Sequence, residues 1–264
     1  MSGGEAKAAA GLMAWYEVMG VDEAIGDAPV DRFAAPPAAD TTAKQDKAPA
    51  RAKAARPPKS AAPASAHAAP ASLEAVKTLS DLEALVAGFE GCALKKTAKN
   101  TCFSRGSDDA RIMLIGEAPG RDEDLQGRPF VGRAGQLLDR MLTAIGLDEK
   151  SVYITNTIYW RPPGNRTPTA QEIEACAPFL TRQIEILSPK VLVLLGGAAA
   201  KSVLNVTEGI MRMRGKWKLY KAKDRDIPTL PTLHPAYLLR SPEAKRYAWR
   251  DLLMLKARLE ETES

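Results

Sequence analysis

The residues of this chain that could do chemistry gather in loops that directly follow short apolar segments. These loops span 116–132, 156–168 and 234–240, and they combine glycine and proline with acidic, amide, imidazole and guanidinium groups. Glycine lets backbone amides approach a phosphate closely, and proline fixes a rigid loop that can press on a nucleic-acid strand. Together the loops predict a surface that binds a polyanion backbone.

The order and spacing of these glycines exclude two common nucleotide sites. The sequence has no G-x-x-x-x-G-K-S/T motif, and no G-x-G-x-x-G follows the apolar segment 112–115. A phosphate-binding loop of either kind is therefore not expected.

The apolar segments indicate how the loops are positioned. We expect buried strands at 112–115, 152–157, 191–195 and 229–233, with helices at 135–145 and 170–187 between them. Strands that alternate with helices predict an α/β fold, a three-layer α/β/α sandwich with a central, mainly parallel four-stranded sheet. Ligands bind at the carboxyl ends of the strands in such folds, where these loops lie.

The ends of two helices carry further signals. Thr169 and Glu172 form a capping box at the start of the helix 170–187, and Pro178 should kink that helix. Ser241 is expected to cap the last helix, with Pro242 in its first position.

Four motifs in this order resemble those of the family 4 uracil-DNA glycosylases. The motifs are Gly116-Glu117-Ala118-Pro119-Gly120, Gly127 to Gly132, Asn156 followed by Arg161-Pro162-Pro163, and His234-Pro235. The resemblance covers residues 79–259, about two thirds of the chain. It implies a monofunctional DNA repair enzyme that flips uracil out of DNA and hydrolyses its N-glycosidic bond, leaving an abasic site.

The resemblance also assigns roles in base recognition and bond cleavage. His234 would stabilise the departing uracil anion at O2. The sequence contains one other histidine, His67, which lies outside these motifs. Asn156 would donate to uracil O4 and accept from N3–H, a pattern that cytosine does not satisfy. Phe130 would stack on the flipped base. The alternatives are that Asn156 only forms a turn at the strand end and that Phe130 is only a core residue.

The motifs do not identify the group that positions the attacking water. Family 1 enzymes have an Asp where this chain has Ala118, so Glu117 or a backbone carbonyl would hold the water, or the oxocarbenium ion would form with little help from a base. Glu117 is the candidate, and Glu123 and Asp124 are alternatives. Gly116, Ala118 and Gly120 should also line the base pocket. Gly120 stands where family 1 enzymes place a thymine-excluding Tyr, so other damaged bases could enter.

Six residues are expected to contact DNA. Tyr237, Leu238 and Leu239 are candidate wedges that fill the gap in the base stack, although packing explains at least one of the leucines as well. The candidate phosphate contacts are Arg161, Arg166 and Arg240. The loop 164–167 contains no His, so the covalent DNA trapping of some relatives is not expected.

Family 4 enzymes usually hold a 4Fe-4S cluster with four cysteines. Here the corresponding positions carry Phe89, Cys92, Trp160 and Cys176. Because two thiolates cannot hold a cubane cluster by ordinary ligation, the sequence predicts a protein without the cluster or any other metal, in which Phe89 and Trp160 fill the space.

Composition divides the chain into three parts. Residues 1–33 include a helix at 6–25 with apolar residues on one face, and residues 73–264 form the glycosylase-like domain. Between them, residues 34–71 contain 17 Ala and 7 Pro and no Leu, Ile, Val or aromatic residue, which predicts a disordered tether. The tether carries +4 of the chain's net +5, so the overall charge says little about a nucleic-acid groove on the domain.

Three cysteines without a C-x-x-C pair favour a reducing compartment, and no apolar stretch is long enough to span a membrane. We therefore expect a cytoplasmic, nucleoid-associated monomer whose partner is single- or double-stranded DNA containing uracil. Two other hypotheses remain: a non-catalytic binder of damaged or abasic DNA on the same fold, and an accessory domain of a polymerase system.

Overall fold

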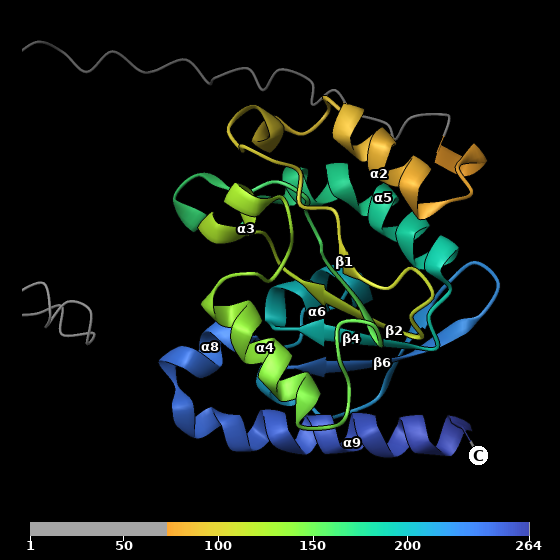
Figure 1. Cartoon of the computed structure of the whole chain (residues 1–264), viewed down its shortest axis with the longest axis vertical. Coiled ribbons are helices and arrows are strands. Elements are labelled where there is room, and N and C mark those ends of the chain that lie inside the picture. Colours follow the sequence, from red (N-terminus) through yellow and green to blue (C-terminus); the bar gives the residue numbers. More distant parts are fainter. Residues whose placement is uncertain (1–72, 264) are drawn as a thin grey trace, which may run out of the picture. The chain divides into compact units, whose positions relative to one another are not determined.

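The computed structural model describes residues 73–263, and a six-stranded sheet forms the centre of this part (Figure 1). The strands are β1 (Arg105–Gly106), β2 (Ile112–Gly116), β3 (Val152–Asn156), β4 (Val191–Leu195), β5 (Lys218–Lys221) and β6 (Asp226–Thr232). Their order is β1-β3-β2-β4-β6-β5. The four central strands are parallel, and β1 and β5 pair antiparallel at the two edges.

The four predicted strands are confirmed as the parallel centre, but the sheet is mixed and larger than the four-stranded one expected. The two additional strands lack the apolar run by which a buried strand is recognised. Strand β1 has only two residues, and β5 alternates half-buried with exposed positions as an edge strand does.

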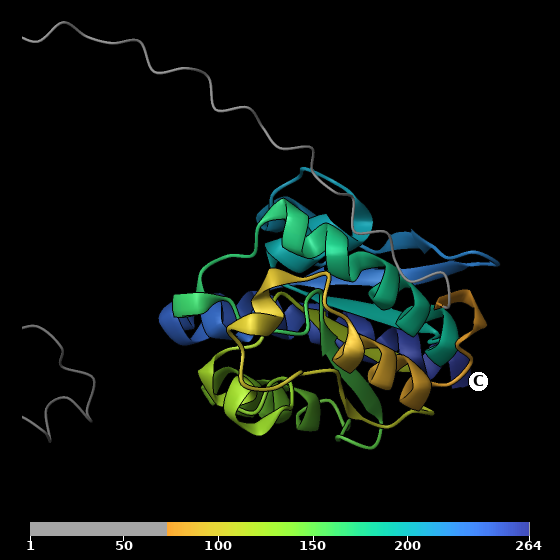
Figure 2. The same ribbon diagram turned by 90° about the horizontal axis from the view of Figure 1, so that it is seen from above.

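Helices cover both faces of the sheet, which confirms the three-layer architecture (Figures 1 and 2). The α-helices are α2 (Leu79–Gly88), α3 (Arg121–Gln126), α4 (Arg133–Thr143), α5 (Ala170–Leu187), α6 (Gly197–Leu204), α7 (Ile210–Met213), α8 (Pro235–Arg240) and α9 (Lys245–Glu263). The 3-10 turns are η1 (Leu73–Ala75), η2 (Ala93–Lys96), η3 (Pro163–Asn165) and η4 (Pro242–Ala244).

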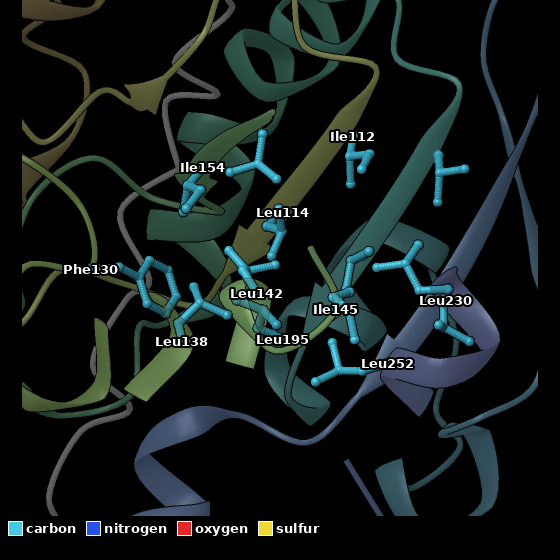
Figure 3. Close-up of a cluster of buried hydrophobic side chains, with 14 residues drawn as sticks. Ile112, Leu114, Phe130, Leu138, Leu142, Ile145, Ile154, Leu195, Leu230 and Leu252 are labelled. Atoms are coloured by element: carbon cyan, nitrogen blue, oxygen red, sulfur yellow. The ribbon is translucent and has the colours of Figure 1, made fainter. Parts of the chain in front are cut away.

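Side chains that alternate along β2 separate two cores. Ile112 and Leu114 pack with α4 and α9, and Figure 3 shows this cluster with Phe130 at its margin beside Leu138. Met113 and Ile115 point to the opposite face and pack with α5 and α6. This alternation follows from the two-residue period of a strand and leaves the sheet buried on both faces.

The helix-end predictions agree with the structure in part. The capping box of α5 is present, since the Glu172 amide donates to Thr169 Oγ1 at 3.3 Å and the Thr169 amide donates to Glu172 Oε2 at 2.8 Å. The helix continues as one element through Pro178. Ser241 precedes η4, not α9 directly, and its side chain makes no capping hydrogen bond.

The predicted N-terminal helix and the Ala/Pro-rich tether, residues 1–33 and 34–71, lie outside the described residues. Within 73–263, none of the helices combines the length and the hydropathy that crossing a bilayer requires.

Candidate active site

A cavity of about 440 Å³ lies at the carboxyl ends of β2, β3 and β6. The sequence-predicted residues that line it are Glu117, Ala118, Gly120, Glu123, Phe130, Asn156, Arg166, His234, Tyr237 and Arg240. The fold therefore brings together residues that are more than one hundred positions apart in the chain, at the edge of the sheet where α/β folds bind ligands.

Asn156 ends β3 and is 1% exposed. Neither its Nδ2 nor its Oδ1 has a hydrogen-bond partner among the described residues. The register of the sheet places Asn156 opposite Gly116, where a Cβ would collide with Asn156 Oδ1 and would lie 2.5 Å from Phe130 Cζ. Because a buried amide without partners costs free energy, this side chain is prepared for a ligand that supplies both an acceptor and a donor.

Phe130 lies beside this amide in an unusual backbone conformation. Its φ is +56°, in the left-handed region that bulky side chains rarely adopt. A Cβ on Gly135 would overlap the carbonyl oxygen of Phe130, so the glycine lets α4 start directly against this backbone. The Phe130 ring lines the cavity, packs against the core and lies 5.6 Å from the His234 ring. Phe130 therefore both packs in the core and faces the cavity, so a structural role and a base-stacking role are compatible.

His234 caps the N-terminus of α8. Its Nδ1 accepts a hydrogen bond from the Ala236 amide at 3.1 Å. Burial, with a smaller effect of the Arg240 charge, lowers the pKa of His234 to about 4. The imidazole is therefore neutral at pH 7, and its proton belongs to Nε2 because Nδ1 is an acceptor. Gly196 allows this placement, since a Cβ there would lie 2.9 Å from His234 Cβ.

The three acidic candidates for positioning water differ in their surroundings. Glu123 accepts hydrogen bonds from the amides of Gly120 at 3.1 Å and Gly132 at 2.8 Å. The carboxylate of Asp124 faces the 99–100 backbone, whose amides donate to it at 2.7 and 3.2 Å. Glu117 lines the cavity without a carboxylate partner in the described residues, and burial raises its pKa. Glu123 and Asp124 thus hold loops together, and Glu117 remains as the available acid.

The predicted phosphate contacts separate into paired and unpaired cations. Arg161 Nε donates to Asn165 Oδ1 at 2.7 Å, and Arg161 is not among the cavity residues. Arg166 lines the cavity but holds Glu172 with two hydrogen bonds of 2.9 and 2.6 Å, which lower the pKa of Glu172 to about 2. Arg240 is exposed and forms no ion pair with another residue of 73–263.

The predicted wedge residues also occupy different positions. Tyr237 is 38% exposed at the cavity, so its ring is free to meet DNA. Leu238 is 1% exposed in a core cluster with Leu233 and Leu137, and the wedge prediction is wrong for it because its side chain does not reach the surface. Leu239 is half-buried against the same cluster.

Sequence reasoning missed several lining residues on the connecting loops. Asn165, Thr167, Pro162 and Ala134 line the cavity without having been singled out. Asn165 has a φ of +54°, in the left-handed region. Its place within the loop 161–168 was the available signal, but the sequence pattern does not show which members of a loop face inward.

A pair of buried thiols lies apart from this cavity. Cys92 and Cys176 lie in one buried cluster, and their interaction lowers the pKa of Cys92 to about 7 and raises that of Cys176. Trp160 is buried in the same cluster, and Phe89 packs against it. Within residues 73–263 there is no group of three or more His, Cys, Asp or Glu side chains arranged to hold a metal ion.

Comparison with known proteins finds relatives over most of the domain. The chain is 40% identical over 174 residues to the type-4 uracil-DNA glycosylase of Archaeoglobus fulgidus, covering 64% of this chain and 87% of that protein. It is 41% identical over 172 residues to the type-4 uracil-DNA glycosylase of Thermotoga maritima, covering 63% and 86%. It also matches a DNA polymerase of Bacillus phage SP01, at 31% identity over 168 residues, 63% of this chain and 18% of the polymerase.

These relatives contradict the prediction that the protein has no iron–sulfur cluster. The type-4 relatives are iron–sulfur enzymes, so the predicted absence of a cluster does not stand. Phe89 and Trp160 replace two of the four ligand positions, which does not establish that the protein lacks a cluster. Of the three free cysteines in the described residues, Cys92 and Cys176 lie together in one buried cluster, and two thiols are half of a cubane ligand set.

The family model named uracil DNA glycosylase superfamily matches residues 103–254, more than half of the chain and the whole of the strand-end cavity. The fold, the four motifs and the relatives agree with this match. The chain belongs to the uracil-DNA glycosylase superfamily.

Proposed function

We propose that this protein is a DNA repair glycosylase that removes uracil from DNA by hydrolysis and leaves an abasic site. The observation that carries the proposal is the buried, unpartnered amide of Asn156 beside the Phe130 ring in a cavity of about 440 Å³. The type-4 relatives, which are uracil-DNA glycosylases, support it.

Asn156 supplies the recognition of uracil. Its Nδ2 donates to O4 of the flipped base, and its Oδ1 accepts from N3–H. Cytosine presents a donor in place of O4 and an acceptor in place of N3–H, so both hydrogen bonds would become repulsive contacts. The Phe130 ring provides the flat apolar surface on which the base stacks.

His234 supplies stabilisation of the leaving group. When the C1′–N1 bond breaks, its electron pair stays on the uracil ring and the negative charge spreads to O2. A neutral imidazole whose Nε2–H points at O2 stabilises that charge, and it costs no reorganisation because Nδ1 is already fixed by the Ala236 amide.

Glu117 is the group that we assign to the attacking water. The water oxygen bonds to C1′ as uracil departs, and the proton that it loses passes to the Glu117 carboxylate. Burial raises the pKa of this carboxyl, which makes it a stronger base than an exposed glutamate. The Glu117 carbonyl already accepts from Thr157 Oγ1 at 2.7 Å, so the side chain is the less occupied acceptor.

The reaction is proposed to stop at the abasic site. The loop 161–168 contains no His that could trap the sugar covalently, which supports a monofunctional enzyme. We further propose that the protein acts as a monomer in the cytoplasm on uracil in single- and double-stranded DNA.

The test uses labelled oligonucleotides that carry uracil, hypoxanthine, xanthine or a T:G mismatch, followed by alkaline cleavage of abasic sites. Uracil should be excised, and Asn156→Ala and His234→Ala should each lose orders of magnitude in rate. His67→Ala, which changes the chain's other histidine, should keep full activity. Binding of uracil DNA without any cleavage would instead favour the non-catalytic binder.

A further inference from the structure

Two exposed arginines stand at the margin of the cavity, and neither was identified from sequence motifs. Arg121 is the first residue of α3 and follows Gly120, which lines the cavity. Arg133 is the first residue of α4 and precedes Ala134, which also lines it. In Figure 1, α3, α8 and the start of α4 lie together on the left, at the end of the sheet where the cavity opens.

One buried carboxylate holds these two helix starts side by side. Glu123 accepts from the Gly120 amide through Oε2 and from the Gly132 amide through Oε1, and these glycines are the residues that precede Arg121 and Arg133. The spacing of the two arginines is therefore set by the fold, although twelve positions separate them in the chain.

The charges of these arginines are not neutralised within residues 73–263. Neither residue forms a hydrogen bond or an ion pair with another described side chain, in contrast to Arg161 and Arg166, which are held by Asn165 and Glu172. Asp122 is the exposed acid next to them, close to Gly132. Arg240 on α8 adds a third exposed arginine without an ion pair among the described residues at this end of the sheet.

We propose that Arg121 and Arg133 bind phosphates of the DNA strand that carries the everted nucleotide, on the α3–α4 side of the cavity. The proposal rests on the function proposed above, because it requires that DNA lie across this opening. A base that enters the cavity leaves its flanking phosphates at the margin, and exposed guanidinium groups are suited to bind phosphate oxygens there.

A second basic surface provides a matched control. Arg111, Lys150, Lys190 and Lys256 surround a cavity of about 590 Å³ near the amino ends of the central strands, which is the opposite edge of the sheet. Lys150 and Lys190 are exposed and of the same charge as the two arginines. Removing the charges of Lys150 and Lys190 changes the net charge of the protein as much as removing those of the two arginines. It leaves the proposed path of the DNA strand unchanged.

The experiment measures the affinity of the full chain for a single-stranded oligonucleotide with a non-hydrolysable 2′-fluoro-deoxyuridine, by fluorescence anisotropy at several NaCl concentrations. The proteins are the wild type, Arg121→Gln, Arg133→Gln, their double variant and the control Lys150→Gln with Lys190→Gln. Removing one arginine–phosphate interaction should reduce the slope of log K against log salt by about 0.7. If the affinities converge near 1 M salt, each arginine variant binds about fivefold more weakly at 0.1 M salt.

The proposal is supported if the double variant lowers the slope by about 1.4, the lysine control does not, and Arg121→Lys with Arg133→Lys restores it. The lysine control should excise uracil at the wild-type single-turnover rate, since Lys150 and Lys190 lie at the opposite edge of the sheet from the cavity. An unchanged slope in the double variant, or an equal decrease in the control, overturns the proposal. If the wild type does not excise uracil, the proposed function fails instead, so the two failures are distinguishable.

Discussion

Replacing Asn156 by leucine should make the protein more stable and inactive at the same time. The Asn156 amide is 1% exposed and both of its polar atoms lack partners in the described structure, so folding leaves it desolvated without compensation. An unsatisfied buried polar group costs about 1–3 kcal/mol, and leucine has a similar branched shape without that cost. We therefore expect Asn156→Leu to increase the free energy of unfolding by about 1–3 kcal/mol.

The measurement is thermal unfolding with and without free uracil, together with single-turnover excision. For a domain of this size the gain corresponds to a rise in Tm of roughly 2–12 °C. Uracil should raise the Tm of the wild type by binding the native state, and it should leave the Tm of the variant unchanged. Loss of two hydrogen bonds to the base should slow excision at least about 100-fold.

Thr155→Val is the matched control on the same strand. Thr155 is also buried, but its hydroxyl donates to the Phe103 carbonyl at 2.6 Å. The valine would leave that carbonyl without its donor, so this variant should lose about 1–3 kcal/mol of stability. If Asn156→Leu is destabilised as much as Thr155→Val, or if it still excises uracil at the wild-type rate, the reasoning about the unpartnered amide is refuted.

Three further predictions follow from the same geometry. The pKa of His234 falls from 6.5 to about 4 on folding, so the unfolded chain binds a proton first and native stability is lost as the pH falls from about 6.5 to 4. Urea unfolding at a series of pH values should show that His234→Asn removes on the order of 3 kcal/mol of this loss. The same loss of stability with falling pH in both proteins would contradict this. Gly135→Ala should destabilise by about 1–3 kcal/mol and slow excision, because its Cβ would displace Phe130, whereas Gly88→Ala, with nothing within 4 Å, should not destabilise. Glu172→Gln should lower KM for uracil DNA with little change in kcat, since it frees the Arg166 charge at the cavity margin; a raised KM in steady-state kinetics would rule this out.

The central part of the fold could be predicted because its strands are buried on both faces. The segments 112–115, 152–157 and 191–195 are short, apolar, partly β-branched runs, and all three correspond to parallel strands. The edge strands β1 and β5 could not be predicted in the same way. Their pairing depends on the neighbours β3 and β6, and it leaves little pattern in the two to four residues of each strand.

In the candidate site, the sequence showed which residue types follow the strands but not which partners they find. Arg161 and Arg166 are as basic as Arg121 and Arg133, yet the fold gives the first two hydrogen-bonding partners and leaves the other two exposed. Likewise Leu238 follows His234 closely, and only the helical turn of α8 determines that it faces the core. Such distinctions depend on tertiary contacts, which a single sequence does not display.

The three named side chains of the cavity share one physical property: each is held in a state that is costly for the folded protein alone. Asn156 is buried without partners, Phe130 has a left-handed backbone, and the pKa of His234 is depressed by burial. The first two conditions cost on the order of 1–3 kcal/mol each, and the third lowers stability as the pH falls below about 6.5. In the proposed mechanism uracil would relieve the first by pairing with the amide, use the second as a stacking surface and require the neutral imidazole of the third. The concentration of these costs in one cavity is therefore the strongest physical argument that a flipped base belongs there.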